Sequence, residues 1–201
     1  TGLRLEELAQ HRRLPELAFV FPVVGGYQQD PETRRATAFT HRGLLHTFRS
    51  FGPRALESWL QRFESVAFSS VRGFLSGSMD LAFQSPHDQR WYVVDWKSNH
   101  LGRSARDYGQ RQLREAMDHH HYHLQYHLYC VALVRYLRTR IPGFSVERDL
   151  GGAFYLFLRG MHPDHAPGTG VYFDRPSPSL IEELDRQLSQ GEGRRGQLPL
   201  L

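Results

Sequence analysis

Two acidic residues and the only lysine of the chain lie close together within residues 73–102. Asp80 stands near the end of one short apolar run. A second apolar run is followed directly by Asp95, Trp96 and Lys97. Successive side chains of a strand point to opposite faces, so Asp95 and Lys97 project on one side and Trp96 on the other. The spacing therefore predicts that a carboxylate and an amine share one face of a sheet.

The two apolar runs, residues 74–83 and 91–94, are predicted to be neighbouring strands. If the polar loop 84–90 closes an antiparallel pair, Asp80 lies beside the acid of the second strand. Residues 91–94 are apolar on both faces, which is typical of a buried central strand. Charged residues such as Asp95 and Lys97 are costly at the end of a buried strand, so their presence there suggests a function.

Carboxylates that lie close together repel each other, and a bound hard cation offsets this repulsion. Mg²⁺ takes oxygen ligands and keeps several waters, so Asp80 and Asp95 are candidate metal ligands. Lys97 can orient a metal-bound water or stabilise the charge that grows on a phosphate under attack. These side chains predict phosphodiester hydrolysis. The alternative is a solvent-facing ion pair, worth ~0–1 kcal/mol.

Four segments, in this order along the chain, resemble the C-terminal nuclease domain of the RecB family, within the PD-(D/E)xK nuclease superfamily. They are GSMDLAF, YVVDWKSNHLG, YHLQYHLYCVALVRYLRTRI and GGAFYLFLRGM. The resemblance is nearly continuous over residues 71–176. It implies an α/β fold of the restriction-endonuclease type, in which helices flank a mixed central sheet.

The resemblance also implies an enzyme of the exodeoxyribonuclease V type, which hydrolyses DNA phosphodiesters with Mg²⁺. Asp80 and Asp95 would bind the metal, with the backbone carbonyl of Trp96 as a further ligand. Lys97 would orient the attacking water or stabilise the transition state.

Candidate DNA contacts flank this hairpin. Ser98 and Asn99 follow the lysine in a predicted turn, where they can hold it or a phosphate oxygen, although turn formation is their ordinary role. Gln125 and Tyr129 are spaced i, i+4 on a predicted helix, residues 110–140, with a break near residues 119–121. In the related nucleases they flank the active site and position DNA or water. The alternative is that Tyr129 belongs to the core and Gln125 to its boundary.

Two further side chains are weaker candidates. Glu16 is the only acid on a predicted early strand, residues 16–24, where related nucleases can carry one; an exposed strand-end carboxylate is the alternative. The RecB family supplies a metal-binding histidine from a helix, in a setting similar to that of His46. Because that helix should precede the first strand, we expect its counterpart upstream of Thr1 and interpret His46 as a surface or core histidine.

Five histidines lie at positions 119, 120, 121, 123 and 127, partly at helical spacing. Zinc requires three or four converging ligands, and nothing else in the sequence supplies them here. We expect a solvated, weakly basic helix face near the DNA. Cys130, in an apolar helical run, is expected to be a buried and inert thiol.

The 201 residues are predicted to form one nuclease domain, residues 1–190, with a disordered tail, residues 191–201. No apolar run approaches the ~20 residues needed to span a bilayer, and no signal peptide begins the chain, so we expect a soluble, cytoplasmic protein. The net charge of +4 comes from arginine, which suits phosphate contact.

The remaining pattern predicts two helices, residues 41–51 and 54–63, and two further strands, residues 153–159 and 171–173. Ser177 followed by Pro178 predicts the start of a closing amphipathic helix, because serine caps helix N-termini and proline favours the first helical position.

The resemblance implies that the chain degrades single strands exonucleolytically, as an attached ATP-dependent helicase produces them from duplex ends. Its setting would be double-strand break repair by homologous recombination, with RecC-like and RecD-like subunits and RecA as partners. Two alternatives remain open. One is a free-standing or CRISPR-associated RecB-like nuclease; the other is a non-catalytic module for DNA binding or docking, against which the intact acids and lysine argue.

Overall fold

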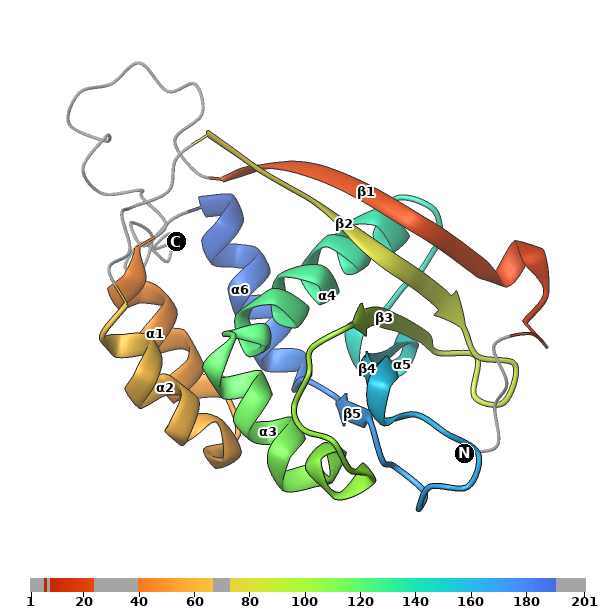
Figure 1. Ribbon diagram of the computed structural model, residues 1–201. Coiled ribbons are helices and arrows are strands. Elements are labelled where there is room, and N and C mark those ends of the chain that lie inside the picture. The colour runs from red at the N-terminus through yellow and green to blue at the C-terminus, as the bar shows by residue number, and fades with distance from the viewer. Residues whose placement is uncertain (1–5, 7, 24–39, 67–72, 191–201) are drawn as a thin grey trace, which may run out of the picture. The chain divides into compact units, whose positions relative to one another are not determined.

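The computed structural model describes residues 6, 8–23, 40–66 and 73–190. Its five strands form one mixed sheet in the order β1-β2-β3-β4-β5, and helices flank it, which confirms the predicted α/β class (Figure 1). The strands are Arg13–Val23 (β1), Gly73–Gln84 (β2), Trp91–Lys97 (β3), Leu150–Phe157 (β4) and Val171–Asp174 (β5).

The α-helices are His41–Phe51 (α1), Glu57–Glu64 (α2), Gln110–His119 (α3), Tyr122–Arg138 (α4), Val146–Asp149 (α5) and Pro178–Gln190 (α6). Four 3₁₀ turns complete the described elements: Gln10–Arg12 (η2), Arg54–Leu56 (η4), Ala105–Tyr108 (η5) and Leu158–Gly160 (η6). No helix within these described ranges is long and apolar enough to cross a membrane.

The chain divides into two compact units. One contains residues 1–18 and 78–176, and the other contains residues 19–77 and 177–201. The first unit therefore contains β3, β4 and β5, together with α3 and α4. The predicted tail, residues 191–201, lies outside the described residues.

In the first unit, β2 and β3 form the predicted antiparallel pair, with Leu81 opposite Val94. β3 then pairs in parallel with β4, so that Asp95 lies opposite Tyr155 and Lys97 opposite Phe157. Parallel neighbours need a long crossover connection, and α3 and α4 supply it here. β3 is therefore a central strand, as its apolar sequence predicts.

The sheet is covered by apolar side chains on one face and by α4 on part of the other. Phe83, Val94 and Leu156 form a buried cluster together with Leu8. α4 contacts both β3 and β4, and α3 contacts β5 (Figure 1). The central strands thus lose water from both faces, and any charged group at their ends is partly desolvated.

α3 and α4 are separate helices, which confirms the break predicted near residues 119–121. His121 adopts a left-handed backbone with φ of 54° and precedes the first residue of α4. A left-handed residue cannot continue a right-handed helix, so α3 ends before His121 and α4 begins at Tyr122. The change of direction lets α4 present its own face to the sheet.

In the second unit, α1, α2 and α6 pack around Trp59, which is fully buried. The Trp59 ring lies 4.9 Å from the ring of Phe48 and 5.1 Å from that of Phe63, centroid to centroid. Ser177 Oγ accepts a hydrogen bond of 3.3 Å from Leu180 N, which confirms the predicted cap of α6.

The predicted bounds of two strands are wrong. β1 begins at Arg13, whereas the early strand was predicted from residue 16. β4 begins at Leu150 and ends at Phe157, whereas the strand was predicted over residues 153–159. The following residues turn into η6, so Arg159 leaves the sheet instead of continuing it. Strand propensity alone does not register this turn, because the sequence stays apolar up to Leu158.

Met79, the residue before Asp80, is fully buried. We expect Met79→Ala to lower the free energy of unfolding by about 2–5 kcal/mol, because it removes buried apolar surface and leaves a cavity. Chemical denaturation followed by circular dichroism measures this loss. Ser78→Ala, at the exposed neighbouring position, is the control and should change it by less than about 0.5 kcal/mol. Equal effects would mean that this part of β2 is not packed as described.

Candidate active site

β3 carries a carboxylate and an amine at its C-terminal end. Asp95 is only 4% exposed, and its Oδ2 lies 2.6 Å from Lys97 Nζ. The intervening Trp96 projects to the other face and is 37% exposed. Alternation along the strand, as predicted, therefore pairs Asp95 with Lys97 on the desolvated side.

Asp80 reaches the same strand end from β2. It stands one residue before Leu81, whose partner across the antiparallel ladder is Val94, so Asp80 is level with the end of β3. Asp80 Oδ2 accepts a hydrogen bond of 2.8 Å from the backbone N–H of Trp96. The hairpin thus brings the two carboxylates and the lysine together.

Lys97 is held on several sides. Its Nζ donates a hydrogen bond of 3.1 Å to Gln125 Oε1 on α4. The same ammonium lies 3.9 Å from the ring centroid of Tyr122 and 4.9 Å from that of Tyr155. Cation–π attraction strengthens when the cation is desolvated, and the Lys97 side chain is only 11% exposed. The amine therefore has one well-defined position.

Gln125 connects this lysine to two tyrosines. Its Oε1 also accepts a hydrogen bond of 2.8 Å from the Tyr155 hydroxyl, and its Nε2 donates one of 2.9 Å to the Tyr129 hydroxyl. Burial, and secondly the charge of Asp95, raise the pKa of both hydroxyls, so each stays protonated. The predicted i, i+4 pair thus shares one polar network with Lys97.

The electrostatics of Asp95 favour a bound cation. Burial raises the pKa of Asp95, the hydrogen bond and charge of Lys97 lower it, and the charge of Asp80 raises it again. The Oδ2 atom is buried, and the Lys97 ammonium lies 2.6 Å from it. Because Asp80 and Asp95 are two carboxylates beside a single ammonium, the group can hold a further positive charge.

The donor set fits a hard cation. Asp80 and Asp95 offer carboxylate oxygens, and Trp96, the residue after Asp95, offers a backbone carbonyl. Mg²⁺ is commonly bound by one or two carboxylates and completes its octahedron with water. Over the described residues no group of three or more His, Cys, Asp or Glu side chains converges, so the two carboxylates are without a third ligand of these kinds there.

The residues that follow β3 have structural partners. Asn99 Oδ1 accepts a hydrogen bond of 3.3 Å from the Tyr122 hydroxyl, and Asn99 Nδ2 lies 3.2 Å from His120 Nε2. The backbone carbonyl of Ser98 accepts one of 2.9 Å from Arg159 Nε. Asn99 therefore holds the turn against α4. Direct DNA contact by either residue stays a prediction.

The two weaker candidates lie elsewhere. Glu16 is exposed on β1 with a left-handed backbone, φ 48°, and among the described residues no hydrogen bond or ion pair joins it to Asp80, Asp95 or Lys97. His46 is exposed on α1, in the second unit. A metal-binding role for Glu16 stays a prediction.

Tyr122 and Tyr155 were not predicted as site residues. Tyr122 is spaced i, i+3 from Gln125, so helical geometry carried a signal for it. Tyr155 lies on a strand that is separated from β3 by α3 and α4, and only the parallel register places it opposite Asp95. No local spacing could have identified that contact.

The histidine prediction is wrong for two of five residues. His119 and His120 are exposed, but His123 is 3% exposed and His127 is fully buried. His123 Nε2 lies 2.9 Å from Asp118 Oδ1, and His127 Nδ1 lies 2.6 Å from the His123 carbonyl oxygen. After the break, α4 turns this face to the core instead of to solvent. Cys130 is buried as predicted.

Burial lowers the pKa of His127 from 6.5 to about 3. Below pH 6.5 the unfolded chain therefore binds a proton that the folded chain does not, and folding stability falls as the pH drops from about 6.5 towards 3. One such group contributes a slope of up to about 1.4 kcal/mol per pH unit. We expect His127→Gln to flatten this slope in denaturation series over the same pH range. His119→Gln, on the exposed end of α3, is the control, and an equally flattened slope there would contradict the assignment.

Comparison with known proteins gives a family match and several similar proteins. The model of the PD-(D/E)XK nuclease superfamily matches residues 3–195. Similar proteins include the RecBCD enzyme subunit RecB of Escherichia coli, 36% identical over 189 residues, which are 94% of this chain and 14% of that protein. The subunit of the same name from Mycobacterium tuberculosis is 37% identical over 199 residues, 94% of this chain and 18% of the relative.

A third relative, the RecBCD enzyme subunit RecB of Haemophilus influenzae, is 48% identical over 122 residues, 61% of this chain and 10% of that protein. The chain thus spans less than a fifth of the length of the curated relatives it matches. The family match, by contrast, covers nearly all of this chain, including the two strand ends and the helix that build the site. The chain belongs to the PD-(D/E)XK nuclease superfamily.

Proposed function

We propose that this chain is a metal-dependent deoxyribonuclease that hydrolyses DNA phosphodiesters at Asp80, Asp95 and Lys97. The observation that carries the proposal is the position of Lys97. Its ammonium is fixed by Asp95, Gln125 and two aromatic rings beside a second carboxylate. A fixed cation next to two carboxylates that can hold a metal ion can stabilise the negative charge of a pentacovalent phosphate.

Asp80 and Asp95 would hold Mg²⁺, with the backbone carbonyl of Trp96 as a third ligand. When bound, the ion polarises a phosphate oxygen and makes water a better nucleophile at neutral pH. Family membership supports a divalent metal in general; Mg²⁺ is our proposal because the donors are oxygens.

The protein's own groups would act by orientation. Lys97 would place its positive charge against the attacked phosphate or the attacking water. Gln125 limits where that charge can move, because its Oε1 receives both the Lys97 ammonium and the Tyr155 hydroxyl. Such preorganisation is valuable because the groups need no rearrangement when the charge develops. Tyr129 and Ser98 would contact the DNA strand.

The name of the relatives supports a proposal for the substrate and setting. Since they are named RecBCD enzyme subunit RecB, we propose exonucleolytic cutting of single strands that an attached ATP-dependent helicase produces. The proposed pathway is double-strand break repair by homologous recombination in the cytoplasm. The proposed partners are RecC-like and RecD-like subunits, with RecA acting on the product strand.

Asp95→Asn and Lys97→Met should each reduce cleavage of end-labelled single-stranded DNA in Mg²⁺ by about 10²–10³-fold or more, because each removes a charge that acts on the transition state. Both substitutions approximately keep the side-chain volume, and methionine can retain the contact with the rings of Tyr122 and Tyr155. Asp164→Asn, at a carboxylate whose side chain is 89% exposed, is the matched control and should cut at the wild-type rate.

Thermal melting of each variant separates loss of chemistry from loss of fold. Unchanged cutting by folded Asp95→Asn and Lys97→Met would reject the site assignment. A wild-type chain that binds DNA but never cuts it, with any divalent metal, would favour the non-catalytic module instead.

Metal dependence can be tested at the ligand positions. Chelation should abolish cleavage, and added Mg²⁺ should restore it. Asp80→Asn should raise the Mg²⁺ concentration for half-maximal activity by about tenfold or more, because a neutral amide replaces a charged ligand. The rate of cleavage titrated against Mg²⁺ measures this shift. Asp88→Asn, in the loop between the same strands, should leave the titration unchanged, and a shift of equal size there would contradict the assignment.

A further inference from the structure

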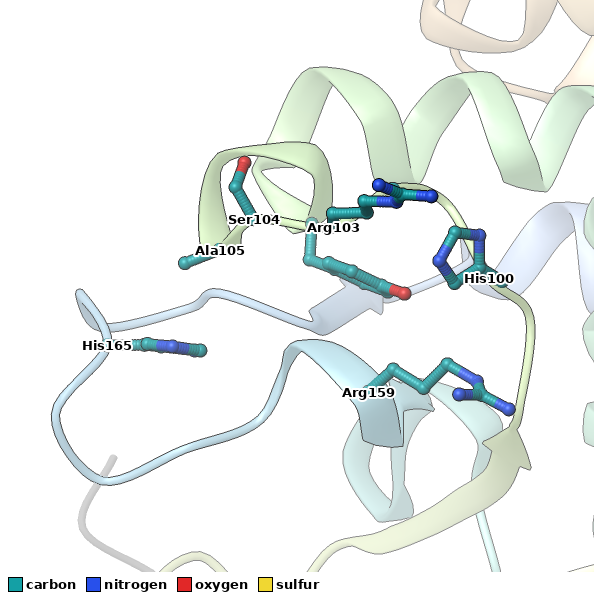
Figure 2. Close-up of a pocket in the computed structure, with 8 residues that line it drawn as sticks. His100, Arg103, Ser104, Ala105, Arg159 and His165 are labelled. Atoms are coloured by element: carbon teal, nitrogen blue, oxygen red, sulfur yellow. The ribbon is translucent and has the colours of Figure 1, made fainter.

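A second concave site lies beyond the end of β3, outside the group of Asp80, Asp95 and Lys97. It is a pocket of about 360 Å³. Its lining includes two arginines and two histidines, namely Arg103, Arg159, His100 and His165. In the view of Figure 2, Arg103, His100 and Arg159 gather at one end of the pocket, and His165, Ser104 and Ala105 lie at the other. We call this the basic pocket.

The basic pocket is a direct continuation of the strands that build the candidate active site. Its two walls are the segment after β3 and the segment after β4. Lys97 and Phe157 are paired in the last register position of these strands. One residue after Lys97, the carbonyl of Ser98 accepts the hydrogen bond from Arg159 Nε. A ligand in the pocket would therefore lie beyond the same edge of the sheet that carries the lysine.

The walls are fixed by Tyr108, a buried member of the lining. Its hydroxyl accepts a hydrogen bond of 3.2 Å from Leu101 N, and its carbonyl accepts one of 2.9 Å from Gly170 N. At Gly160 a Cβ atom would lie 2.4 Å from the Tyr108 side chain, so only glycine allows this approach. The pocket is thus preformed by contacts between the two segments.

A third contact reinforces the second wall. Gln110 Nε2, at the start of α3, donates hydrogen bonds of 2.9 Å to the carbonyls of both Gly168 and Val171. The segment between β4 and β5 is therefore tied to the helix that follows the first wall. A preformed pocket loses little conformational entropy when a ligand binds.

Within the described residues, no ion pair neutralises the two arginines of the basic pocket. Asp107, the nearest acid in sequence, accepts hydrogen bonds of 2.8 and 2.9 Å from Ser104 N and Oγ in the cap of η5, and its charge also acts on His100. Among the described residues Arg103 has no carboxylate within ion-pair distance. In the part of the chain that the structure describes, Arg159 bonds through its Nε alone, which leaves its terminal N–H groups for a ligand. His165 Nδ1 contacts the Gly160 carbonyl, and its Nε2 makes no hydrogen bond to another described residue.

We propose that the basic pocket binds a phosphate group of the DNA strand whose adjacent phosphodiester lies at Lys97. This inference rests on the proposed nuclease function and names a subsite of it. Guanidinium groups match phosphate oxygens in a two-pronged geometry, and two of them line this pocket. Such a contact carries no sequence information but fixes the strand's register, as cutting at successive positions requires.

The test is binding of fluorescein-labelled single-stranded DNA in EDTA, where no cutting occurs, measured by anisotropy over a series of salt concentrations. Arg103→Ala and Arg159→Ala should each weaken binding by about tenfold at low salt. Each should also make the slope of log K against log salt shallower by about 0.7, the value for one phosphate contact on a single strand. Arg106→Ala, at an exposed arginine of η5 outside the pocket, is the matched control.

Oligonucleotides with a 5′-phosphate, a 3′-phosphate or neither distinguish two sources of the phosphate. Equal loss with all three supports an internal phosphate, and loss confined to one phosphorylated end supports a terminal phosphate in the same pocket. Affinity and slope that match those of Arg106→Ala would overturn the inference, even if Asp95→Asn and Lys97→Met abolish cutting. Conversely, loss of binding in the pocket variants with cutting intact in Asp95→Asn and Lys97→Met would reject the proposed catalytic site and keep the pocket.

Discussion

The contact between Asp95 and Lys97 is the interaction on which the rest of the site depends. The two groups stand two residues apart on a central strand, 2.6 Å from each other, with little access to solvent. Taking two charges out of water costs several kcal/mol per ion, and their attraction alone seldom offsets that cost. The surrounding groups reduce it. Gln125 gives the ammonium an oxygen, and the rings of Tyr122 and Tyr155 give it aromatic faces.

This balance also argues for function over stability. A buried ion pair can usually be replaced by well-packed apolar residues without loss of stability. Here the pair is kept, and a second carboxylate reaches the same strand end from β2. Burying the pair and bringing two carboxylates together both cost folding free energy. Together they make sense if a cation and an anionic substrate complete the charge balance when they bind.

The site and the basic pocket share one architectural cause. β3 and β4 run parallel, so their C-terminal ends lie at the same edge of the sheet, where Lys97 pairs with Phe157. The segments that leave this edge carry His100 and Arg103 on one side and Arg159 and His165 on the other. The hydrogen bond between Arg159 and Ser98 joins them immediately beyond the lysine. A strand of DNA that places one phosphodiester at the lysine would thus find cationic groups for its neighbour.

The local parts of this arrangement could be predicted from sequence spacing, because each depends on a few neighbouring residues. Alternation along residues 91–97 separates Trp96 from the face of Asp95 and Lys97. The loop after β2 closes an antiparallel pair, and i, i+4 spacing places Gln125 with Tyr129. The position of Tyr155 opposite Asp95 and the contact of Arg159 with Ser98 appear only in the folded chain. The same is true of His123 and His127, which face the core. These contacts depend on the register of a parallel pair joined through α3 and α4, and on the direction that α4 takes after His121. Both are set by packing of distant segments, which local spacing does not encode.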